Sequence, residues 1–448
     1  MNVYNARRQP VDLGAEIGRG GEAIVYRLAV QPALLAKIYH GRARDGYAEK
    51  LAWMQANPPD DPTRGQGHAS IAWPNDLLFD GNSDLVGYVM VHVQNAVPLL
   101  QVFNPRSRAK TLPNFNRRYL HRAARNLAAA LGALHASNYI VGDLNESNVM
   151  VTPSALITLI DTDSFQVQRR VGAKPVLHPC PVGKPEYTPP ELQGKTFAEV
   201  PRQPEHDRFG LAVLIFQLLM EGNHPFRAQW LGSGDPPPVE DRIRDGAWPY
   251  ARRPKLPVAP PRGGPGIETL HPDLVKLART AFVDGHNDPR ARPLPEEWEE
   301  ALTIAERALL SCGHGHLYSR HLAECPECRA KSEAVTAARR PTWTAAKPAS
   351  TRGAPTHSTH GMPPFPNAWP GSLRLRGLSW SSVAAAFRPV PPVVLSSVTC
   401  GDCGRVSPAG EIYCQNCRHR LLSRRPCPHC RRAIPGNAHF CPKCGKQV

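Results

Sequence analysis

Six residues between Gly18 and Asp161 have the types and the order that phosphoryl transfer requires. The reaction needs a backbone loop that covers phosphates, a lysine that holds them, oxygen ligands for Mg²⁺ and a group that orients the attacking hydroxyl. The candidates are Gly18, Gly20, Lys37, Asp143, Asn148 and Asp161. Each has a structural explanation when taken alone, but the ordered series predicts a phosphotransferase.

The first of these features is a glycine-rich turn between two predicted strands. Residues 18–25 read Gly-Arg-Gly-Gly-Glu-Ala-Ile-Val. They fit the phosphate-covering pattern G-x-G-x-x-G-x-V, which ends here at Val25, except for alanine at the third glycine. Lys37 ends the next predicted strand, where its ammonium either reaches α- and β-phosphates or lies at a strand edge. Glu49 follows on a predicted helix, where it either pairs with Lys37 or faces solvent.

Metal-binding side chains recur after position 140. Asp143 and Asn148 are five residues apart, the spacing of a catalytic aspartate and a metal-binding asparagine. Asp161 ends a predicted strand, where its carboxylate suits Mg²⁺ or Mn²⁺. Asp207 opens a predicted buried helix, which it either caps or links to the loop around Asp143.

Eleven of the twelve cysteines lie between Cys312 and Cys444, mostly as C-x-x-C pairs. Such a pair supplies two thiolates for a tetrahedral zinc ion from one tight turn. The spacing C-x2-C-x10-C-x2-C occurs twice near the end of the chain, which predicts a double zinc ribbon. One zinc site consists of Cys400, Cys403, Cys414 and Cys417, and the other of Cys427, Cys430, Cys441 and Cys444.

A third zinc site is predicted just before the ribbons. Its ligands are Cys312, His316, Cys325 and Cys328. His314 competes with His316, His321 is less suitable, and unpaired thiols at a helix end are the alternative. We therefore expect two to three Zn²⁺ ions per chain. The N-terminal residues lack the apolar run of a secretory signal, which favours reduced thiolates in a cytoplasmic protein over disulfides.

The positive charge of the chain is concentrated in its last third. The 448 residues carry a net charge of +16, and the part from Ser311 onward holds 19 Lys+Arg against 5 Asp+Glu. The first 310 residues are therefore nearly neutral, which argues against nucleic-acid binding there. The basic tail predicts an acidic partner: a protein, a nucleic acid or an anionic lipid. No stretch approaches 18 consecutive apolar residues, so we expect no transmembrane segment.

The elements that must hold these residues change from strands to helices along the chain. Apolar alternation predicts three strands over residues 11–40 and two more over 70–93, with a short helix over 45–56. An apolar stripe from Leu120 to Leu134 predicts a long amphipathic helix.

The second half of this region is predicted to be mainly helical. Residues 149–160 form two short strands, residues 207–220 a helix that is apolar on every face, and residues 270–310 further helix. Residues 232–268 are rich in Pro and Gly, which predicts a surface insertion.

This ordered series resembles the eukaryotic-like protein kinase superfamily over residues 11–310. The resemblance implies an α+β, bilobal kinase fold that binds ATP between its lobes. It makes Lys37 and Glu49 an ion pair that orients phosphates, Asp143 the catalytic base, and Asn148 and Asp161 the Mg²⁺ ligands. It also places Met90 at the back of the ATP pocket and pairs Glu191 with Arg292.

The expected domain order follows from this resemblance and from composition. A kinase domain at 11–310 is followed by a small zinc-binding segment at 311–330. A Pro-, Ala-, Ser- and Arg-rich linker at 331–398, which we expect to be disordered, leads to the double zinc ribbon at 399–448. The Cys-rich tail loosely resembles those of bacterial kinases with zinc-ribbon extensions, some of them associated with tellurium resistance.

The sequence departs from the kinase pattern at three motifs. The usual H-R-D reads Val141-Gly142-Asp143, and the usual D-F-G reads Asp161-Thr162-Asp163. The lysine that Ser/Thr kinases carry two residues after the catalytic aspartate is Asn145. Because Lys184 occupies the position of a threonine in the activation segment, we hypothesise that its ammonium contacts Asp143 and the γ-phosphate instead.

The departures also predict how the enzyme is activated. Between Phe165 and Glu186 the activation segment has no Ser, Thr or Tyr, and glycine replaces the arginine that would bind a phosphate. We therefore predict a cytoplasmic Ser/Thr protein kinase that acts on a protein substrate without activation-loop phosphorylation. The alternative is an ATP-binding pseudokinase scaffold with a zinc-ribbon adaptor tail.

Overall fold

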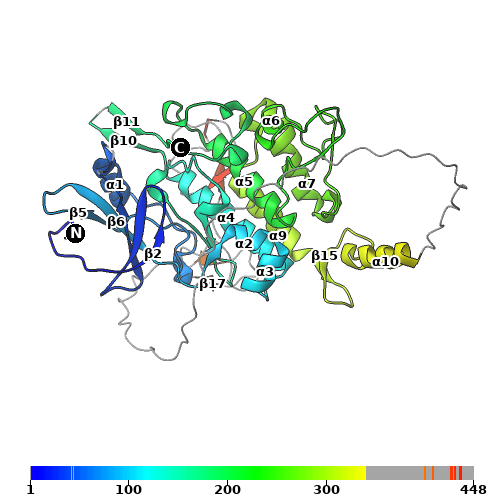
Figure 1. Ribbon diagram of the computed structural model, residues 1–448, viewed down its shortest axis with the longest axis horizontal. Coiled ribbons are helices and arrows are strands. Elements are labelled where there is room, and N and C mark those ends of the chain that lie inside the picture. The colour runs from blue at the N-terminus through cyan, green and yellow to red at the C-terminus, as the bar shows by residue number, and fades with distance from the viewer. Residues whose placement is uncertain are drawn as a thin grey trace, which may run out of the picture.

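An antiparallel six-stranded sheet forms the N-terminal lobe of the computed structural model (Figure 1). The structure describes residues 2–41, 43, 45–172 and 174–339, and short pieces at 398–399, 406–407, 424–426, 428–429 and 433–435. In spatial order, the strands are β1 (Tyr4–Asn5), β5 (Asp76–Phe79), β6 (Leu85–Val91), β4 (Leu34–Tyr39), β3 (Ala23–Leu28) and β2 (Leu13–Arg19). The strands predicted over 11–40 and 70–93 are thus confirmed.

The register of this sheet places the polar side chains of β4 and β6 on one face. Lys37 lies opposite Tyr88 on β6, and Tyr39 follows two residues later on the same face of β4. Gly87 allows the two strands to approach, because a Cβ atom there would lie 2.0 Å from the carbonyl oxygen of Lys37. Helix α1 (Tyr47–Ala56) is the short helix predicted between the strands.

The C-terminal lobe is mainly helical, and its core surrounds α4 and α5. The helices are α2 (Leu99–Phe103), α3 (Pro105–Thr111), α4 (Arg117–Ala136), α5 (Pro204–Leu219), α6 (Val239–Arg244), α7 (Pro272–Arg279), α8 (Gly285–Asn287) and α9 (Pro295–Arg307). The expected apolar stripe of α4 is buried from Leu120 to Leu134. Nearly all of α5 is buried, as its uniformly apolar composition predicted.

Short turns connect the helices and strands of both lobes. They are the 3₁₀ turns η1 (Arg64–Gln66), η2 (Glu146–Asn148), η3 (Thr162–Ser164), η4 (Pro185–Tyr187), η5 (Pro190–Leu192), η6 (Phe197–Glu199), η7 (Ile267–Thr269) and η9 (Pro289–Ala291), and the π turn η8 (Thr280–Asp284). The predicted surface insertion at 232–268 is wrong in part. It contains α6, and both Ile243 and Trp248 are buried in the main core.

Small β-ladders support the loops between the lobes. The strands β7 (Val97–Pro98), β8 (Val149–Val151) and β9 (Ile157–Leu159) form one sheet, and β12 (Gln229–Trp230) pairs with β13 (Val258–Ala259). The activation segment, which was not expected to contain strands, forms a hairpin of β10 (Val167–Val171) and β11 (Lys174–His178). Strand β10 packs against α1, so the segment contacts the N-terminal lobe.

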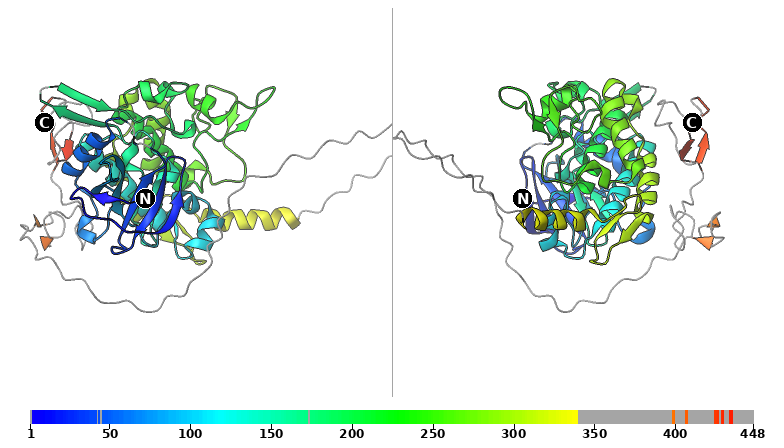
Figure 2. Two further views of the ribbon diagram at one scale, coloured as in Figure 1. Left: turned by 60° about the vertical axis from the view of Figure 1, so that its left-hand side comes forward. Right: turned by 90° about the vertical axis from the view of Figure 1, so that its right-hand side faces the viewer.

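Beyond the helical lobe, a short hairpin of β14 (Leu309–Ser311) and β15 (Leu317–Ser319) leads into α10 (Pro326–Arg339), which projects from the lobe (Figure 2). Helix therefore occupies the first residues of the linker predicted at 331–398, and residues 340–397 lie outside the described part. Among the described helices, none has both the length and the apolar character needed to cross a membrane.

Candidate active site

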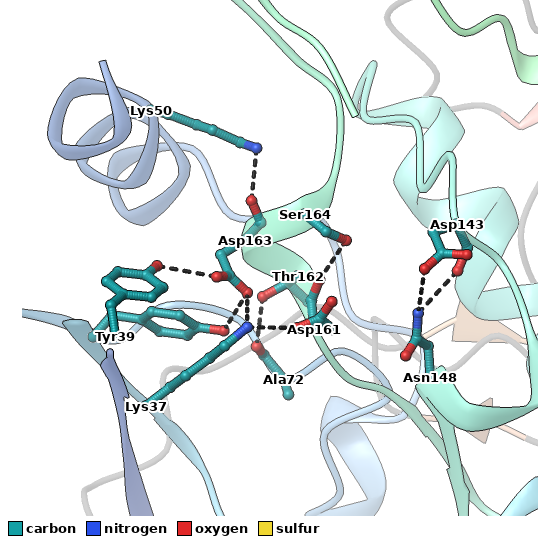
Figure 3. A network of polar contacts seen from close by, with 11 residues as sticks. Lys37, Tyr39, Lys50, Ala72, Asp143, Asn148, Asp161, Thr162, Asp163 and Ser164 are labelled. Carbon is teal, nitrogen blue, oxygen red and sulfur yellow. Dashed lines mark hydrogen bonds and ion pairs between the residues drawn. The ribbon is translucent and has the colours of Figure 1, made fainter. Parts of the chain in front are cut away.

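Lys37 lies at the centre of a buried polar network between the lobes (Figure 3). Its ammonium is 2.5 Å from Asp161 Oδ1 and 2.6 Å from Asp163 Oδ1. Burial alone would lower the pKa of this ammonium, but the two carboxylates raise the pKa above its usual value. Lys37 therefore stays charged, as a phosphate-binding lysine must.

The predicted ion pair between Lys37 and Glu49 is not formed. Both residues are described, and Lys37 instead pairs with two aspartates of the segment after β9. Glu49 is exposed on α1, whereas Leu51 and Met54 are buried. Residues two apart on a helix point about 200° from each other, so the face that buries Leu51 turns Glu49 outward.

Asp163 occupies the position of the glycine in the D-F-G pattern, and its carboxylate is enclosed. In addition to Lys37, Tyr88 donates a hydrogen bond to Oδ1 at 2.9 Å and Tyr39 donates one to Oδ2 at 3.0 Å. The Lys50 ammonium donates to the Asp163 carbonyl oxygen at 2.7 Å. Burial would raise the pKa of Asp163, but the charge of Lys37 and these hydrogen bonds hold the pKa below its usual value.

The side chain of Asp207 stabilises the loop that carries Asp143. Its carboxylate accepts hydrogen bonds from the backbone N–H groups of Val141 and Gly142, both at 2.8 Å. The Oδ2 atom that accepts from Val141 also contacts His135 Nε2 at 2.9 Å. Of the two roles considered for Asp207, the structure therefore shows the link to the catalytic loop.

Asp143 and Asn148 come together as their spacing predicts. Asn148 Nδ2 donates to Asp143 Oδ2 at 3.2 Å, and Asn145 Nδ2 donates to Asp143 Oδ1 at 2.7 Å. Burial, reinforced by the charge of Asp161, raises the pKa of the Asp143 carboxyl, and the two amides oppose this rise. These hydrogen bonds fix the direction of the carboxylate that would face an attacking hydroxyl.

Asn148 and Asp161 offer the hard oxygen ligands that Mg²⁺ prefers. Because the nitrogen of the Asn148 amide binds Asp143, its oxygen is the atom left for a metal. The Asp161 side chain is 36% exposed and has a left-handed backbone, with φ of 64°. A non-glycine residue in this region is strained, and such strain concentrates at functional sites. The donor set therefore fits a hard divalent cation.

The residues predicted to contact a nucleotide lie on the N-terminal sheet. Gly18 pairs with Val25 across β2 and β3, and the Gly20 N–H closes the turn on the Ala23 carbonyl oxygen at 2.9 Å. Val25 lies opposite Lys37 on the same face of the sheet. Met90 is buried on β6 and lies opposite Leu35, two residues before Lys37. Val25 and Met90 thus lie on the two strands that flank Lys37, and the glycine-rich turn precedes the strand that carries Val25.

The predicted contact of Lys184 with Asp143 is wrong. The Lys184 ammonium donates to Glu146 Oε1 at 2.8 Å and to Ser147 Oγ at 2.6 Å. The oxygens of Asp143 already accept from two amides, while Glu146 presents a carboxylate to the activation segment. Lys184 therefore ties the activation segment to the catalytic loop, and Asn145 is the residue that contacts Asp143.

Glu191 and Arg292 form the ion pair implied by the kinase resemblance. Two parallel hydrogen bonds of 2.6 and 2.7 Å join their side chains, and Arg292 is fully buried. Burial alone would raise the pKa of Glu191, but Arg292 holds the pKa below its usual range. The pair thus contributes stability above that range and loses it as the pH falls through the lowered pKa.

Replacing Arg292 with alanine should lower the free energy of unfolding by about 3–5 kcal/mol, because the Glu191 charge is then left without its buried partner. Urea unfolding followed by tryptophan fluorescence measures this change. The exposed Arg253 provides a matched control, since Arg253→Ala should change stability by less than about 0.5 kcal/mol. Equal effects of the two substitutions would contradict the assignment.

A candidate metal centre lies at the end of the helical lobe. Cys312 Sγ, His316 Nδ1, Cys325 Sγ and Cys328 Sγ all lie within 4.8 Å of one another. His316 Nδ1 is 3.5, 3.7 and 3.4 Å from the three sulfurs in chain order. Zinc bond lengths place the ligand atoms of a tetrahedral site about 3.6–3.8 Å apart, so these residues fit zinc.

The surroundings of His316 distinguish it from its competitors. Its second ring nitrogen, Nε2, is 3.4 Å from a carboxylate oxygen of Glu327, and such a carboxylate typically orients a metal-binding histidine. His314 Nδ1 approaches only Cys328, at 3.4 Å. His321 instead contacts the Glu268 carbonyl oxygen at 3.0 Å, on the helical lobe.

The eight cysteines predicted for the two ribbons lie outside the described residues. Four short strands near them are described: β16 (Val398–Thr399) pairs with β17 (Val406–Ser407), and β18 (Arg424–Pro426) pairs with β19 (Ala433–Pro435). In the sequence, each pair of strands brackets the first C-x-x-C of one ribbon. A protein-family model, described as a double zinc ribbon, matches residues 400–445.

Comparison with curated proteins identifies relatives of this chain. The chain is 33% identical over 341 residues to "Protein kinase YegI" of Escherichia coli O157:H7, and 32% identical over 343 residues to the protein of that name from strain K12. The alignments cover 74% and 75% of this chain and 51% of each relative, so the chain spans about half the length of these relatives. The ordered motifs, the bilobal α+β fold and these relatives support a bacterial protein kinase with a C-terminal double zinc ribbon.

Proposed function

We propose that this chain is an ATP-dependent protein kinase that transfers the γ-phosphate of ATP to Ser or Thr hydroxyls of a protein substrate. The observation that carries the proposal is that two contacts lie near each other between the lobes, Lys37 with Asp161 and Asn148 with Asp143, because strand β8 after Asn148 pairs with strand β9 before Asp161 (Figure 3). The naming of the E. coli relatives as protein kinases supports it.

Each residue near these two contacts has a proposed role in this reaction. The Lys37 ammonium binds the α- and β-phosphates beneath the glycine-rich turn, and Val25 and Met90 contact the adenine. Asp143 orients the attacking hydroxyl and accepts its proton, while Asn145 holds the carboxylate in place. Asn148 and Asp161 would hold Mg²⁺ or Mn²⁺, which when bound neutralises charge on the β- and γ-phosphates.

We further propose that the chain binds three Zn²⁺ ions, two in the ribbons and one at Cys312, His316, Cys325 and Cys328. The close approach of those four ligand atoms supports the third site. Thiolate ligands suit a reducing compartment such as the cytoplasm. The excess of basic residues in the tail supports an acidic partner, which the ribbons would bring to the kinase domain.

The direct test is to incubate the purified full chain with labelled ATP and Mg²⁺, with and without a generic protein substrate. We expect phosphate incorporation that is abolished by chelation of Mg²⁺. In the Asp161→Ala variant it should fall by at least about 10³-fold, since a ligand for the charge-neutralising metal is lost.

Acid hydrolysis of the labelled product then identifies the phosphorylated amino acid, and we expect phosphoserine or phosphothreonine. Label on tyrosine would refute the specificity but not the transfer. Nucleotide binding without any transfer would refute the kinase and favour the scaffold.

A further inference from the structure

The acid that pairs with Lys37 comes from the segment after β9 and not from helix α1. Lys37 and Tyr39 lie on the same face of β4, and Tyr88 lies opposite Lys37 on β6. All three side chains converge on the Asp163 carboxylate, at 2.6, 3.0 and 2.9 Å. The sheet register therefore builds a binding site for one carboxylate directly beside the lysine.

The two aspartates that contact Lys37 differ in access to solvent. The Asp161 side chain is 36% exposed and is the candidate metal ligand, whereas the Asp163 side chain is 2% exposed. A metal that binds Asp161 would compete with Lys37 for its carboxylate. Asp163 is enclosed by three donors and cannot turn toward a metal, so it remains the anionic partner of Lys37 when nucleotide and metal are present.

Helix α1 contributes a cation to this network and no acid. Lys50 is 1% exposed, and its ammonium donates to the Asp163 carbonyl oxygen at 2.7 Å. Figure 3 shows Lys50 reaching from the helix to the backbone of the segment. The neighbouring Glu49 faces outward. The ion pair expected between Lys37 and helix α1 is thus replaced by a pair between Lys37 and Asp163, and Lys50 occupies the inner face of the helix.

We propose that Asp163 is the positioning residue that holds Lys37 for nucleotide binding, and that it takes the place of the acid expected on helix α1. This inference rests on the proposed kinase function. It also implies that β4, β6 and the residues next to Asp161 fix the position of Lys37. A displacement of α1 would therefore leave Lys37 paired with Asp163.

The test compares three variants of the full chain. Asp163→Asn removes the charge at nearly constant shape, Glu49→Gln does the same on the helix, and Asp84→Asn repeats the Asp-to-Asn change on an exposed turn. The first measurement is the rate at which N-hydroxysuccinimide acetate acetylates Lys37, read by peptide mass spectrometry. The second is kcat and the KM for ATP.

In Asp163→Asn we expect Lys37 acetylation to accelerate about tenfold, since the ammonium loses the carboxylate that holds it in the buried network and becomes accessible to the reagent. We expect kcat to fall about 10²-fold from misplacement of the phosphates, with a smaller rise in KM. In Glu49→Gln and Asp84→Asn, the acetylation rate and kcat should both stay within about twofold of wild type. The reverse order, with Glu49→Gln affecting Lys37 and Asp163→Asn neutral, would overturn the proposal.

Two features keep the test decisive. If Asp163→Asn does not fold, Tyr39→Phe removes one hydrogen bond to the same carboxylate, and Lys37 acetylation should rise about two- to tenfold. Unchanged acetylation in folded Tyr39→Phe would then contradict the proposal. Because acetylation does not depend on turnover, the expected labelling pattern in a protein without kinase activity would refute the proposed function and leave the Lys37–Asp163 pair standing.

Discussion

Replacing Arg202 with alanine is expected to lower kcat about 10²-fold while the KM for ATP stays within about twofold of wild type. Arg202 is buried, and its guanidinium donates to the carbonyl oxygens of Val182 at 3.0 Å and Gly142 at 3.3 Å. It thereby joins the activation segment to the catalytic loop. The nucleotide contacts on the N-terminal lobe are not altered by its removal, so the loss should fall on kcat.

The position of Arg202 supports the prediction that the loop needs no phosphate. Gly142 stands where the kinase pattern has its phosphate-binding arginine, and a Cβ atom at Gly142 would lie 2.6 Å from Cys180 Cβ. Cys180 and Arg202 therefore fill the space beside the loop. Gln166, at the start of the segment, exchanges hydrogen bonds with the backbone of Arg202 at 2.6 and 2.9 Å. Arg202 thus contacts both ends of the segment, through its backbone at Gln166 and through its guanidinium at Val182.

Steady-state kinetics of Arg202→Ala beside Lys195→Ala measures this effect. Lys195 is exposed on the same segment, so its removal should change kcat less than about twofold. Phosphatase treatment of the wild-type chain should leave kcat unchanged, because no Ser, Thr or Tyr lies between Phe165 and Glu186 and Gly142 replaces the phosphate-binding arginine. A large drop after phosphatase, reversed by autophosphorylation, or an Arg202→Ala variant with full activity would refute this account.

The fold and the order of the site residues were predictable because each depends on short-range pattern. Alternation in the strands placed Lys37 on a sheet, and the five-residue spacing placed Asp143 beside Asn148. The partner of Lys37 was not predicted because Glu49 was chosen as the glutamate on the helix after Lys37, without regard to the face of the helix it occupies. The positions of the apolar residues on the helix predict the contact better. Leu51 and Met54 define the inner face of α1, and that face includes Lys50 and excludes Glu49.

Other features were missed because their sequence signals were weak or misleading. The activation-segment hairpin turns at Gly172, with φ of 61°, but its Arg- and Pro-containing strands give little alternation to recognise. Trp248 is buried within a stretch whose average composition resembles a surface loop. Lys184 was assigned to Asp143 by position in a motif, whereas the nearest available carboxylate, that of Glu146, decided its contact.

Removing the metal from the Cys312 site should unfold the segment from Cys312 to Cys328 while the kinase lobes remain folded. The segment is anchored to the helical lobe by the hydrogen bond from Arg320 N–H to the Ala308 carbonyl oxygen and by His321. Within Cys312–Cys328, Ser319 and Cys325 are the buried residues. So little buried surface cannot offset chain entropy, and zinc sites of this type contribute roughly 10–16 kcal/mol of binding free energy.

Elemental analysis and limited proteolysis together test this last expectation. The wild-type chain should contain about three Zn²⁺ ions, and Cys328→Ser or His316→Ala about two, because a tetrahedral site with three protein ligands binds much more weakly. His314→Ala and Cys180→Ala should retain three, since neither residue belongs to the cluster. Trypsin should cleave after Arg320 and Arg329 rapidly in the two-zinc variants and slowly in wild type. A wild-type chain with two zinc ions, unchanged in Cys328→Ser, would show that these four side chains gather without a metal.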